Sequence, residues 1–190
     1  MSYHIYITEA LVCGTYNRNT SDRSVALFTR EAGMLYASVR SAREERSKHR
    51  YALQDFSVAR VSLVRGKAGW KVIGVEPITS LYWNTSTRAG RAVVRNVVRL
   101  LRRFVGGEEP MPEVYDDIMS ALSVQDVLTD RLELLLTLRT LSALGYIDPE
   151  GKNRAFIEAP DTLSVLNDVT DSHEVESRRA IARAFETSHL

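Results

Sequence analysis

The chain has 190 residues, a mass of 21.4 kDa and 44% hydrophobic residues, so it can bury a core as one domain or two small ones. Its single cysteine, Cys13, excludes an internal disulfide and a cysteine-rich zinc site. No apolar run approaches the roughly 18 residues of a membrane span. The first residues lack the basic start and the long apolar core of a secretory signal. We therefore expect a cytoplasmic protein.

The net charge of +1 conceals opposite charges in the two halves of the chain. Residues 1–107 contain 18 Lys and Arg against 7 Asp and Glu, a net charge of +11, whereas residues 108–190 carry a net charge of −10. Fifteen of the 18 basic residues are Arg, whose planar guanidinium suits phosphate contacts. This asymmetry suggests that the N-terminal half binds a polyanion. The alternative is that the two halves neutralise each other in the folded protein.

The first eighty residues show the alternation and the turn residues of β-strands. We expect five strands, over residues 3–13, 23–29, 34–39, 56–65 and 70–78. The turn before the third strand ends in Gly33, where a positive φ is expected. Five antiparallel strands in so short a segment are expected to close into a small barrel, because closure removes exposed edges. The OB-fold has this size and strand number, although the strand number alone also allows an SH3-like barrel.

After residue 82 the hydrophobic period changes to 3.6, which predicts helices. The first helix covers residues 88–105 and ends at Gly106-Gly107, and a second begins near Pro110 and Pro112. A third helix, capped by Thr129 or Asp130, carries leucines around most of its circumference and is expected to be central. A weaker helix over residues 161–168 and a last one, which Ser172 caps and which ends near Thr187, complete the bundle. The sequence thus predicts an all-β domain over residues 1–82, a five-stranded OB-fold barrel, followed by an all-α helical bundle over residues 83–190.

The sequence shows none of the common motifs of catalysis. The four histidines have no metal-ligand spacing, and only one cysteine could join them. The chain contains neither a phosphate-binding P-loop nor a Gly-x-Ser-x-Gly nucleophile motif. Asp116 and Asp117 are adjacent on a helix and point about 100° apart, so we expect them to be solvated charges. We expect no enzyme, no metal and no cofactor.

Arginines occupy one side of the first predicted helix at steps of three and four residues. No acidic residue lies between Arg88 and Arg103. Like charges at i, i+4 destabilise a helix, so an anionic group should compensate them. The compensating group could be nucleic-acid phosphate, the acidic tail of a partner protein, or the acidic C-terminal half itself. The members of this arginine stripe are Arg88, Arg91, Arg95, Arg99 and Arg102.

Basic and aromatic residues of the predicted barrel are candidates for nucleic-acid contacts. Long cationic side chains in loops reach phosphates, and exposed rings stack on unpaired bases. Burial in the core is the favoured role for Phe28 and Phe56, whereas Tyr16 in a loop and Trp70 beside a turn are the better candidates for stacking. The combination favours single strands over sequence-specific reading of a duplex. The basic candidates are Arg18, Arg23, Arg40, Arg43, Arg46, Lys48, Arg50, Arg65 and Lys67.

Several segments of the N-terminal region form a recognisable pattern: Thr8-Glu-Ala-Leu-Val-Cys13, Arg23, Leu27-Phe-Thr-Arg-Glu-Ala-Gly33, Val39-Arg-Ser-Ala-Arg43, Ser47 and Leu53-Gln-Asp-Phe56. With these segments, residues 3–82 resemble the N-terminal domain of the RecO family, which comprises bacterial DNA repair and recombination mediators. The leucine-rich helix with Leu144-Gly145-Tyr146 resembles the family's helical domain over residues 88–147 more loosely. This chain has Ser41 where the family usually has Gly, has Asp55 where it usually has Pro, and lacks the Cys-x-x-Cys zinc module of many relatives.

The resemblance implies an OB-fold followed by a helical bundle. It implies binding to single- and double-stranded DNA, annealing of complementary strands, and loading of RecA together with a RecR partner. It also implies contact with the C-terminal tail of the single-stranded DNA-binding protein SSB. Such a protein would act in the bacterial cytoplasm, associated with the nucleoid, as part of the DNA damage response.

Two functional hypotheses follow from the sequence. The first is a non-enzymatic DNA-binding mediator, in which the barrel and the arginine stripe hold backbone phosphates. Annealing then follows because one basic surface that neutralises two strands lowers their repulsion. The second is a protein-interaction adaptor, in which the arginine stripe binds an acidic peptide and the barrel is only a scaffold. An SSB tail is acidic and ends in apolar residues, so both hypotheses can hold for one protein.

Overall fold

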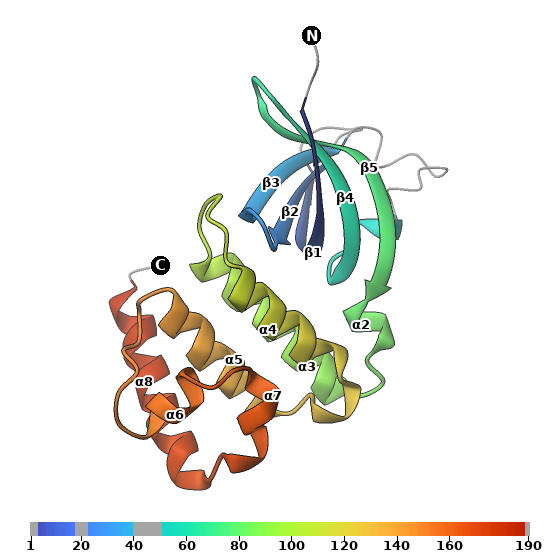
Figure 1. Cartoon of the computed structure of the whole chain (residues 1–190). Helices are drawn as coiled ribbons and strands as arrows, with labels where there is room; N and C mark the ends of the chain where they lie inside the picture. The colour runs from blue at the N-terminus through green and yellow to red at the C-terminus, as the bar shows by residue number, and fades with distance from the viewer. Residues whose placement is uncertain (1–3, 18–22, 40–50, 189–190) are drawn as a thin grey trace. The chain divides into compact units, whose positions relative to one another are not determined.

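The computed structural model describes residues 4–17, 23–39 and 51–188. Six basic candidates therefore lie outside the described residues: Arg18, Arg40, Arg43, Arg46, Lys48 and Arg50. The chain divides into two compact units (Figure 1). We call Met1–Asn84 with Gly106–Pro112 the barrel unit, and Thr85–Val105 with Glu113–Leu190 the helical unit.

Five strands of the barrel unit hydrogen-bond in the order β1-β2-β3-β5-β4 and close into a barrel (Figure 1). All neighbouring strands are antiparallel except β3 and β5, which are parallel. The long first strand closes the barrel, because its first half pairs with β4 and its second half with β2. The strands are β1 (Ile5–Asn17), β2 (Arg23–Thr29), β3 (Gly33–Val39), β4 (Ser57–Gly66) and β5 (Gly69–Ser80), followed by the short helix α2 (Leu81–Asn84).

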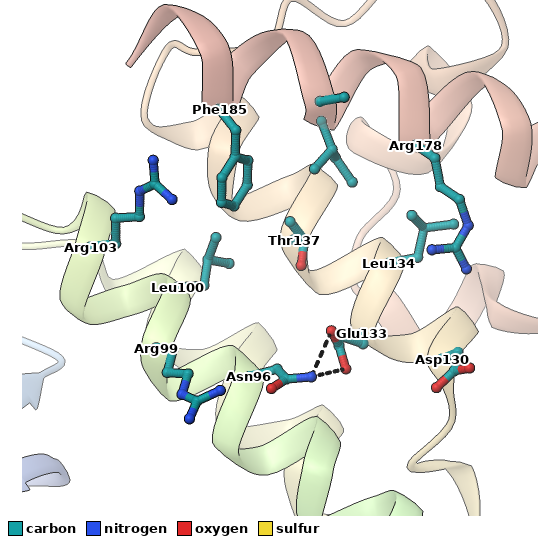
Figure 2. Close-up of a pocket in the computed structure, with 12 residues that line it drawn as sticks. Asn96, Arg99, Leu100, Arg103, Asp130, Glu133, Leu134, Thr137, Arg178 and Phe185 are labelled. Carbon is teal, nitrogen blue, oxygen red and sulfur yellow. Dashed lines mark hydrogen bonds between the residues drawn. The ribbon is translucent and has the colours of Figure 1, made fainter. Parts of the chain in front are cut away.

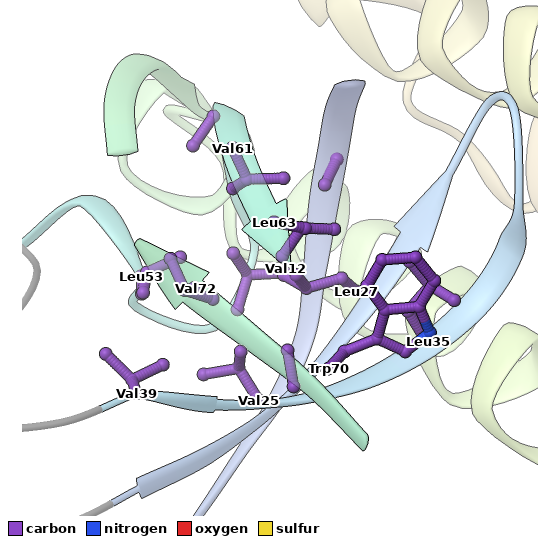
Figure 3. Packing of buried hydrophobic residues seen from close by; sticks show 13 residues of the cluster. Val12, Val25, Leu27, Leu35, Val39, Leu53, Val61, Leu63, Trp70 and Val72 are labelled. Atoms are coloured by element: carbon purple, nitrogen blue, oxygen red, sulfur yellow. The ribbon is translucent and has the colours of Figure 1, made fainter. Parts of the chain in front are cut away.

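Alternating apolar residues of all five strands fill the barrel (Figure 3). Val25 and Leu27 from β2 meet Leu35 from β3 and Trp70 from β5, and all four are buried. The hairpin between β2 and β3 turns at Gly33, whose φ of 60° confirms the expected positive value. A Cβ at this glycine would overlap the carbonyl oxygen of Glu109, so the close approach of segment 106–112 also requires glycine here.

The helical unit is built around α5, as its leucine pattern predicts. Helices α3, α6, α7 and α8 all contact α5, which buries leucines on most of its circumference. The prediction of five strands followed by helices is therefore confirmed. The helices are α3 (Arg88–Phe104), α4 (Pro112–Ser123), α5 (Asp130–Ala143), α6 (Arg154–Ile157), α7 (Thr162–Val165) and α8 (Asp171–Thr187), with 3-10 turns at Gln125–Val127, Gly151–Asn153 and Leu166–Asp168.

Side-chain caps determine where the long helices begin. The Thr129 hydroxyl accepts the Leu132 N–H at 3.4 Å and caps α5, one of the two expected alternatives. The last helix begins at Asp171 with Thr170 as its cap, so the predicted cap at Ser172 is wrong. His173 accounts for the difference, because its Nδ1 accepts the Thr170 backbone N–H at 3.2 Å and holds this residue at the start of the helix.

Asp117 is not a solvated charge, contrary to the expectation from its sequence position. Its side chain is 12% exposed, and its Oδ2 lies 2.7 Å from Nε of Arg139. The same carboxylate accepts bonds from the backbone N–H and the hydroxyl of Thr162. Arg139 also donates to the carbonyls of Phe156, Ile157 and Ala159. This network joins α4 and α5 to α6 and the start of α7, a long-range pairing that the local sequence does not reveal.

The boundary between the units differs from the predicted division at residue 82. Gly106–Pro112 follows α3 but belongs to the barrel unit, where the Met34 N–H donates to the Gly107 carbonyl at 3.1 Å. Within the described residues, no helix has the length and apolar character needed to cross a bilayer.

Candidate nucleic-acid interface

One row of cross-strand neighbours winds along the wall of the barrel. Tyr16 pairs with Ser24, Ser24 with Ser38, Ser38 with Lys71, and Lys71 with Val64. The row then reaches Ile5 at the start of β1, whereas Tyr16 lies near the end of the same strand, so it forms a spiral rather than a ring around one end. Candidate residues that are scattered over some fifty positions of the sequence therefore lie along one path on the barrel wall. We call the residues on or beside this path, Tyr16, Arg23, Arg65, Lys67 and Lys71, the basic row of the barrel.

The basic row combines accessible cations with one accessible ring. Arg65 and Lys67 are exposed at the β4–β5 hairpin, and Arg23 is half-buried at the start of β2. Tyr16 lies in β1 rather than in the expected loop, but it remains 38% exposed. The Arg23 Nε is buried and has no hydrogen-bond partner among the described residues. The pairs of Asn17 with Arg23 and of Arg23 with Val39 place the last described residues of β1 and β3 beside Arg23.

Trp70 is not an exposed stacking platform, contrary to the expectation from its position beside a turn. It is 8% exposed and belongs to the barrel core (Figure 3). The ring of Tyr6 packs edge-on against it with centroids 5.1 Å apart. The indole still makes a polar contact, because its Nε1–H donates a hydrogen bond to Glu108. Phe28 is fully buried as expected, and Phe56 is half-buried and stacks on Tyr82.

A carboxylate of segment 106–112 contacts the β4–β5 hairpin at two atoms. The Trp70 Nε1–H donates to Oε1 of Glu108 at 2.9 Å. The other oxygen, Oε2, lies 3.0 Å from Nη1 of Arg65. The Arg65 guanidinium also lies over the Trp70 ring, 5.4 Å from its centroid. Arg65 and Trp70 are cross-strand neighbours, so the hairpin register itself brings both donors to one carboxylate.

The arginine stripe lies on the accessible side of α3, while two rows of valines and leucines on the same helix are buried. Arg88, Arg95, Arg99 and Arg102 are exposed. Arg91 is half-buried, and its Nε donates to the Thr85 carbonyl at 2.9 Å. Arg88, Arg95 and Arg99 form no ion pair with any carboxylate of the described residues. Direct pairing with the acidic half therefore does not compensate these three charges.

A groove of about 780 Å³ runs between α3, α5 and α8 (Figure 2). Leu100, Leu134 and Phe185 form apolar parts of its wall, and Arg99 belongs to the arginine stripe. The sequence reasoning missed Arg103 and Arg178, which also line the groove. Arg103 lies 4.7 Å from the Phe185 ring centroid. The sequence could have indicated Arg103, because it follows Arg102 of the arginine stripe. The approach of α8 to Arg103, however, depends on the tertiary structure.

Glu133 lies in this groove and is partly withdrawn from water. Burial raises the pKa of the Glu133 carboxyl above its ordinary value of 4.5, and the nearby Asp130 adds to the increase. The Asn96 side-chain amide opposes it by donating to both carboxylate oxygens at 3.1 Å (Figure 2). Arg178 and Arg95 also lower this pKa through their charges. The groove therefore has cations and one poorly solvated carboxyl beside an apolar wall.

The charge asymmetry of the sequence does not coincide with the two structural units. The barrel unit contains 12 basic and 9 acidic residues, a net charge of +3. The helical unit contains 13 basic and 15 acidic residues, a net charge of −2, because it includes α3. The positive charge is thus concentrated at local surfaces of both units rather than in one half of the molecule. No group of three His, Cys, Asp or Glu side chains suited to a metal occurs within the described part of the chain.

Comparison with known proteins identifies the N-terminal region. Residues 1–81 match the family model described as recombination protein O N terminal. A DNA repair protein RecO from Myxococcus xanthus is 30% identical over 142 residues, which cover 74% of this chain and 58% of that protein. Similar RecO proteins from Dehalococcoides mccartyi and Desulfitobacterium hafniense are 29% and 28% identical, over 65% and 75% of this chain and 49% and 52% of theirs. The chain therefore spans about half the length of the curated relatives that it matches.

Proposed function

Because its N-terminal domain places this chain in the RecO family of DNA repair and recombination proteins, we propose that it is a non-enzymatic mediator. It binds single- and double-stranded DNA and anneals complementary strands. It also helps to load RecA onto DNA that is coated with SSB. The observation that carries this proposal is the basic row of the barrel, where cross-strand pairing aligns Arg23, Arg65 and Lys67 with Tyr16 along one path on the barrel wall.

We assign the barrel to the OB-fold. It has five strands, closes in the order β1-β2-β3-β5-β4, and pairs β3 with β5 in parallel. OB-folds use an exposed sheet face and adjoining loops to bind oligonucleotides. Here Asn17 and Val39, which precede segments 18–22 and 40–50 in the sequence, both pair with Arg23. We propose that the cations of these segments extend the phosphate-binding surface: Arg18, Arg40, Arg43, Arg46, Lys48 and Arg50.

We also propose protein partners, from membership of the RecO family and from the groove in the helical unit. A RecR-like mediator and, indirectly, RecA are the partners implied by family membership. The groove between α3, α5 and α8 supports the tail of SSB as a third partner. Its arginines suit the acidic residues of such a tail, and its apolar wall suits the apolar end. The arginine stripe then serves DNA, this tail, or both.

Binding of a fluorescent single-stranded oligonucleotide to the full chain tests the DNA-binding proposal. We expect binding without sequence preference, measured as anisotropy at several salt concentrations. The logarithm of the binding constant should fall with the logarithm of the salt concentration, by about 0.7 for each phosphate neutralised. Folded protein that shows no binding at low salt would contradict the proposal. Binding of an SSB tail peptide without DNA binding would instead support the adaptor hypothesis.

A further inference from the structure

Glu108 occupies a position that suits an oxyanion from outside the protein. Its two carboxylate oxygens take one donor each, the Trp70 indole N–H at 2.9 Å and the Arg65 guanidinium at 3.0 Å. A phosphodiester group also carries one negative charge and two free oxygens, so it can satisfy the same two donors. The pair of donors is held in place by the β4–β5 register and by burial of the indole ring.

The contact is open to competition. The Arg65 side chain is 62% exposed and that of Glu108 is 40% exposed, so both face water and dissolved anions. Exposed ion pairs of this kind contribute little, with a median of about 0–1 kcal/mol. The backbone beside Glu108 is anchored by the bond from the Met34 N–H to the Gly107 carbonyl. Exchange of the carboxylate therefore requires only a side-chain rotation.

The surroundings favour a polyanion over a single small anion. Lys67 is exposed in the same hairpin, and Lys71 is half-buried within the row that reaches Tyr16. These cations continue from Arg65 along the basic row. A strand whose phosphates follow this row would place one phosphate at the Glu108 position.

We propose that Arg65 and the Trp70 indole N–H form a phosphate site for single-stranded nucleic acid, and that Glu108 is a built-in competitor that occupies this site in the free protein. The inference rests on the proposed function and adds a regulatory residue to it. Trp70 then contributes as a hydrogen-bond donor rather than as a stacking ring. DNA binding exchanges one intramolecular ion pair for a phosphate contact, so Glu108 lowers affinity for DNA.

Glu108→Gln tests this proposal, with Glu109→Gln as the matched control. The first variant removes the competing charge but keeps an oxygen that can accept from Trp70. The second removes the same charge from the next residue, whose side chain is also exposed. We expect Glu108→Gln to bind a fluorescent oligothymidylate about two- to fivefold more tightly at low salt than the parent. Its salt slope should steepen by about 0.7, because Arg65 gains a phosphate without losing a partner.

Arg65→Ala distinguishes release of a specific site from a change in overall charge. In the double variant Arg65→Ala/Glu108→Gln, the gain from Glu108→Gln should disappear, whereas a general charge effect would persist. Trp70 supplies a second readout in a Trp83→Phe background, since the chain has only two tryptophans. Addition of the oligonucleotide should shift Trp70 emission in that background, and Arg65→Ala should reduce the shift.

The outcomes separate this proposal from the general function. If the parent chain does not bind the oligonucleotide at low salt, the proposed function fails. If the parent binds but Glu108→Gln and Glu109→Gln behave alike, Glu108 is not a competitor and this inference is overturned. A lower melting temperature for Glu108→Gln with unchanged affinity would assign Glu108 a structural role only, which also overturns it.

Discussion

Residue type alone does not determine the role of a side chain in the basic row of the barrel. Tyr16 belongs to this row and Trp70 is next to its member Lys71, yet only Tyr16 presents an accessible ring. The difference arises because Trp70 points into the core and closes it beside Leu27 and Leu35. Its indole N–H still needs a partner when the ring is buried. Glu108 provides that partner, so one residue contributes to both the core and the candidate site.

The partly buried carboxyl of Glu133 is expected to make the stability of the protein depend on pH. Burial raises the pKa of its carboxyl, so the folded state keeps this proton at pH values where the unfolded chain has lost it. The contribution of Glu133 to stability therefore falls as pH rises from about 4.5 through the raised pKa. Glu133→Gln should be more stable than the parent at pH 7.5, because it removes a poorly solvated charge and keeps one bond from Asn96. This advantage should shrink toward pH 4.

Urea unfolding at both pH values measures this difference as a change in midpoint. Glu186→Gln on α8 is the control, because Glu186 is exposed and the variant removes the same charge without relieving burial. A stability difference for Glu133→Gln that is the same at pH 4 and pH 7.5 would contradict the role assigned to burial.

At the scale of elements, α3 combines a buried apolar side with a cationic side that is mostly exposed. Its valines and leucines pack within the helical unit against α5, which leaves Arg95 and Arg99 exposed. Thr87 caps the helix by accepting the Gly90 N–H at 3.0 Å, so helix formation does not depend on the arginines. Changes to the stripe should therefore act on binding more than on folding.

The double reversal Arg95→Glu/Arg99→Glu separates the three possible roles of the stripe. If the stripe binds DNA, affinity for DNA should fall and the salt slope should flatten by roughly one to two. If it binds an acidic tail, DNA binding should hardly change while binding of the SSB tail peptide is lost. If it only neutralises the acidic part of the chain, both bindings should survive and the melting temperature should fall.

Anisotropy titrations with DNA and peptide, together with thermal melts, provide the three measurements. The matched control is Arg179→Glu/Arg183→Glu on α8, which makes the same change in net charge at two exposed positions outside the stripe. Equal loss of DNA affinity in both variants would show that net charge, not the stripe, determines binding.

The whole molecule distributes its positive charge over two units with small net charges of opposite sign. A basic surface that neutralises two strands at once lowers the repulsion between them, and this is the physical requirement for annealing. The proposed function therefore predicts that the chain accelerates annealing of complementary oligonucleotides. The acceleration should decrease steeply as salt rises, because counterions then screen both strands.

Removing the cations of segment 40–50 should slow this annealing. The variant that changes Arg40, Arg43, Arg46 and Lys48 to Ala should also bind single strands more weakly. Its stability should stay within about 0.5 kcal/mol of the parent, as for surface charges in general. Annealing rates of fluorescently labelled strands, measured alongside a control with Lys152, Arg179 and Arg183 changed to Ala, give the comparison. Binding and annealing at the parent's level would remove this segment from the site.

The order and type of the elements could be predicted from the sequence alone, because they depend on local patterns. Alternation of apolar residues predicts the strands, the 3.6-residue period predicts α3 and α5, and Gly33 predicts its turn. The segments that resemble the RecO family follow one another along the sequence. The N-terminal domain could therefore be identified without knowing how its strands pair. The arginine stripe was visible for the same reason, since a single helix determines which of its residues share a side.

Only the tertiary structure decided which distant residues meet. Burial of Trp70, pairing of Asp117 with Arg139, and the contact of Glu108 with the β4–β5 hairpin each join residues that are far apart in the chain. The alignment of Tyr16, Arg23 and Arg65 along one row likewise depends on strand register and barrel closure. Local propensity acts over a few residues, whereas register and burial are set by packing of the whole core. The sequence therefore determined the family and the order of the secondary-structure elements. The tertiary structure determined which basic side chains are exposed.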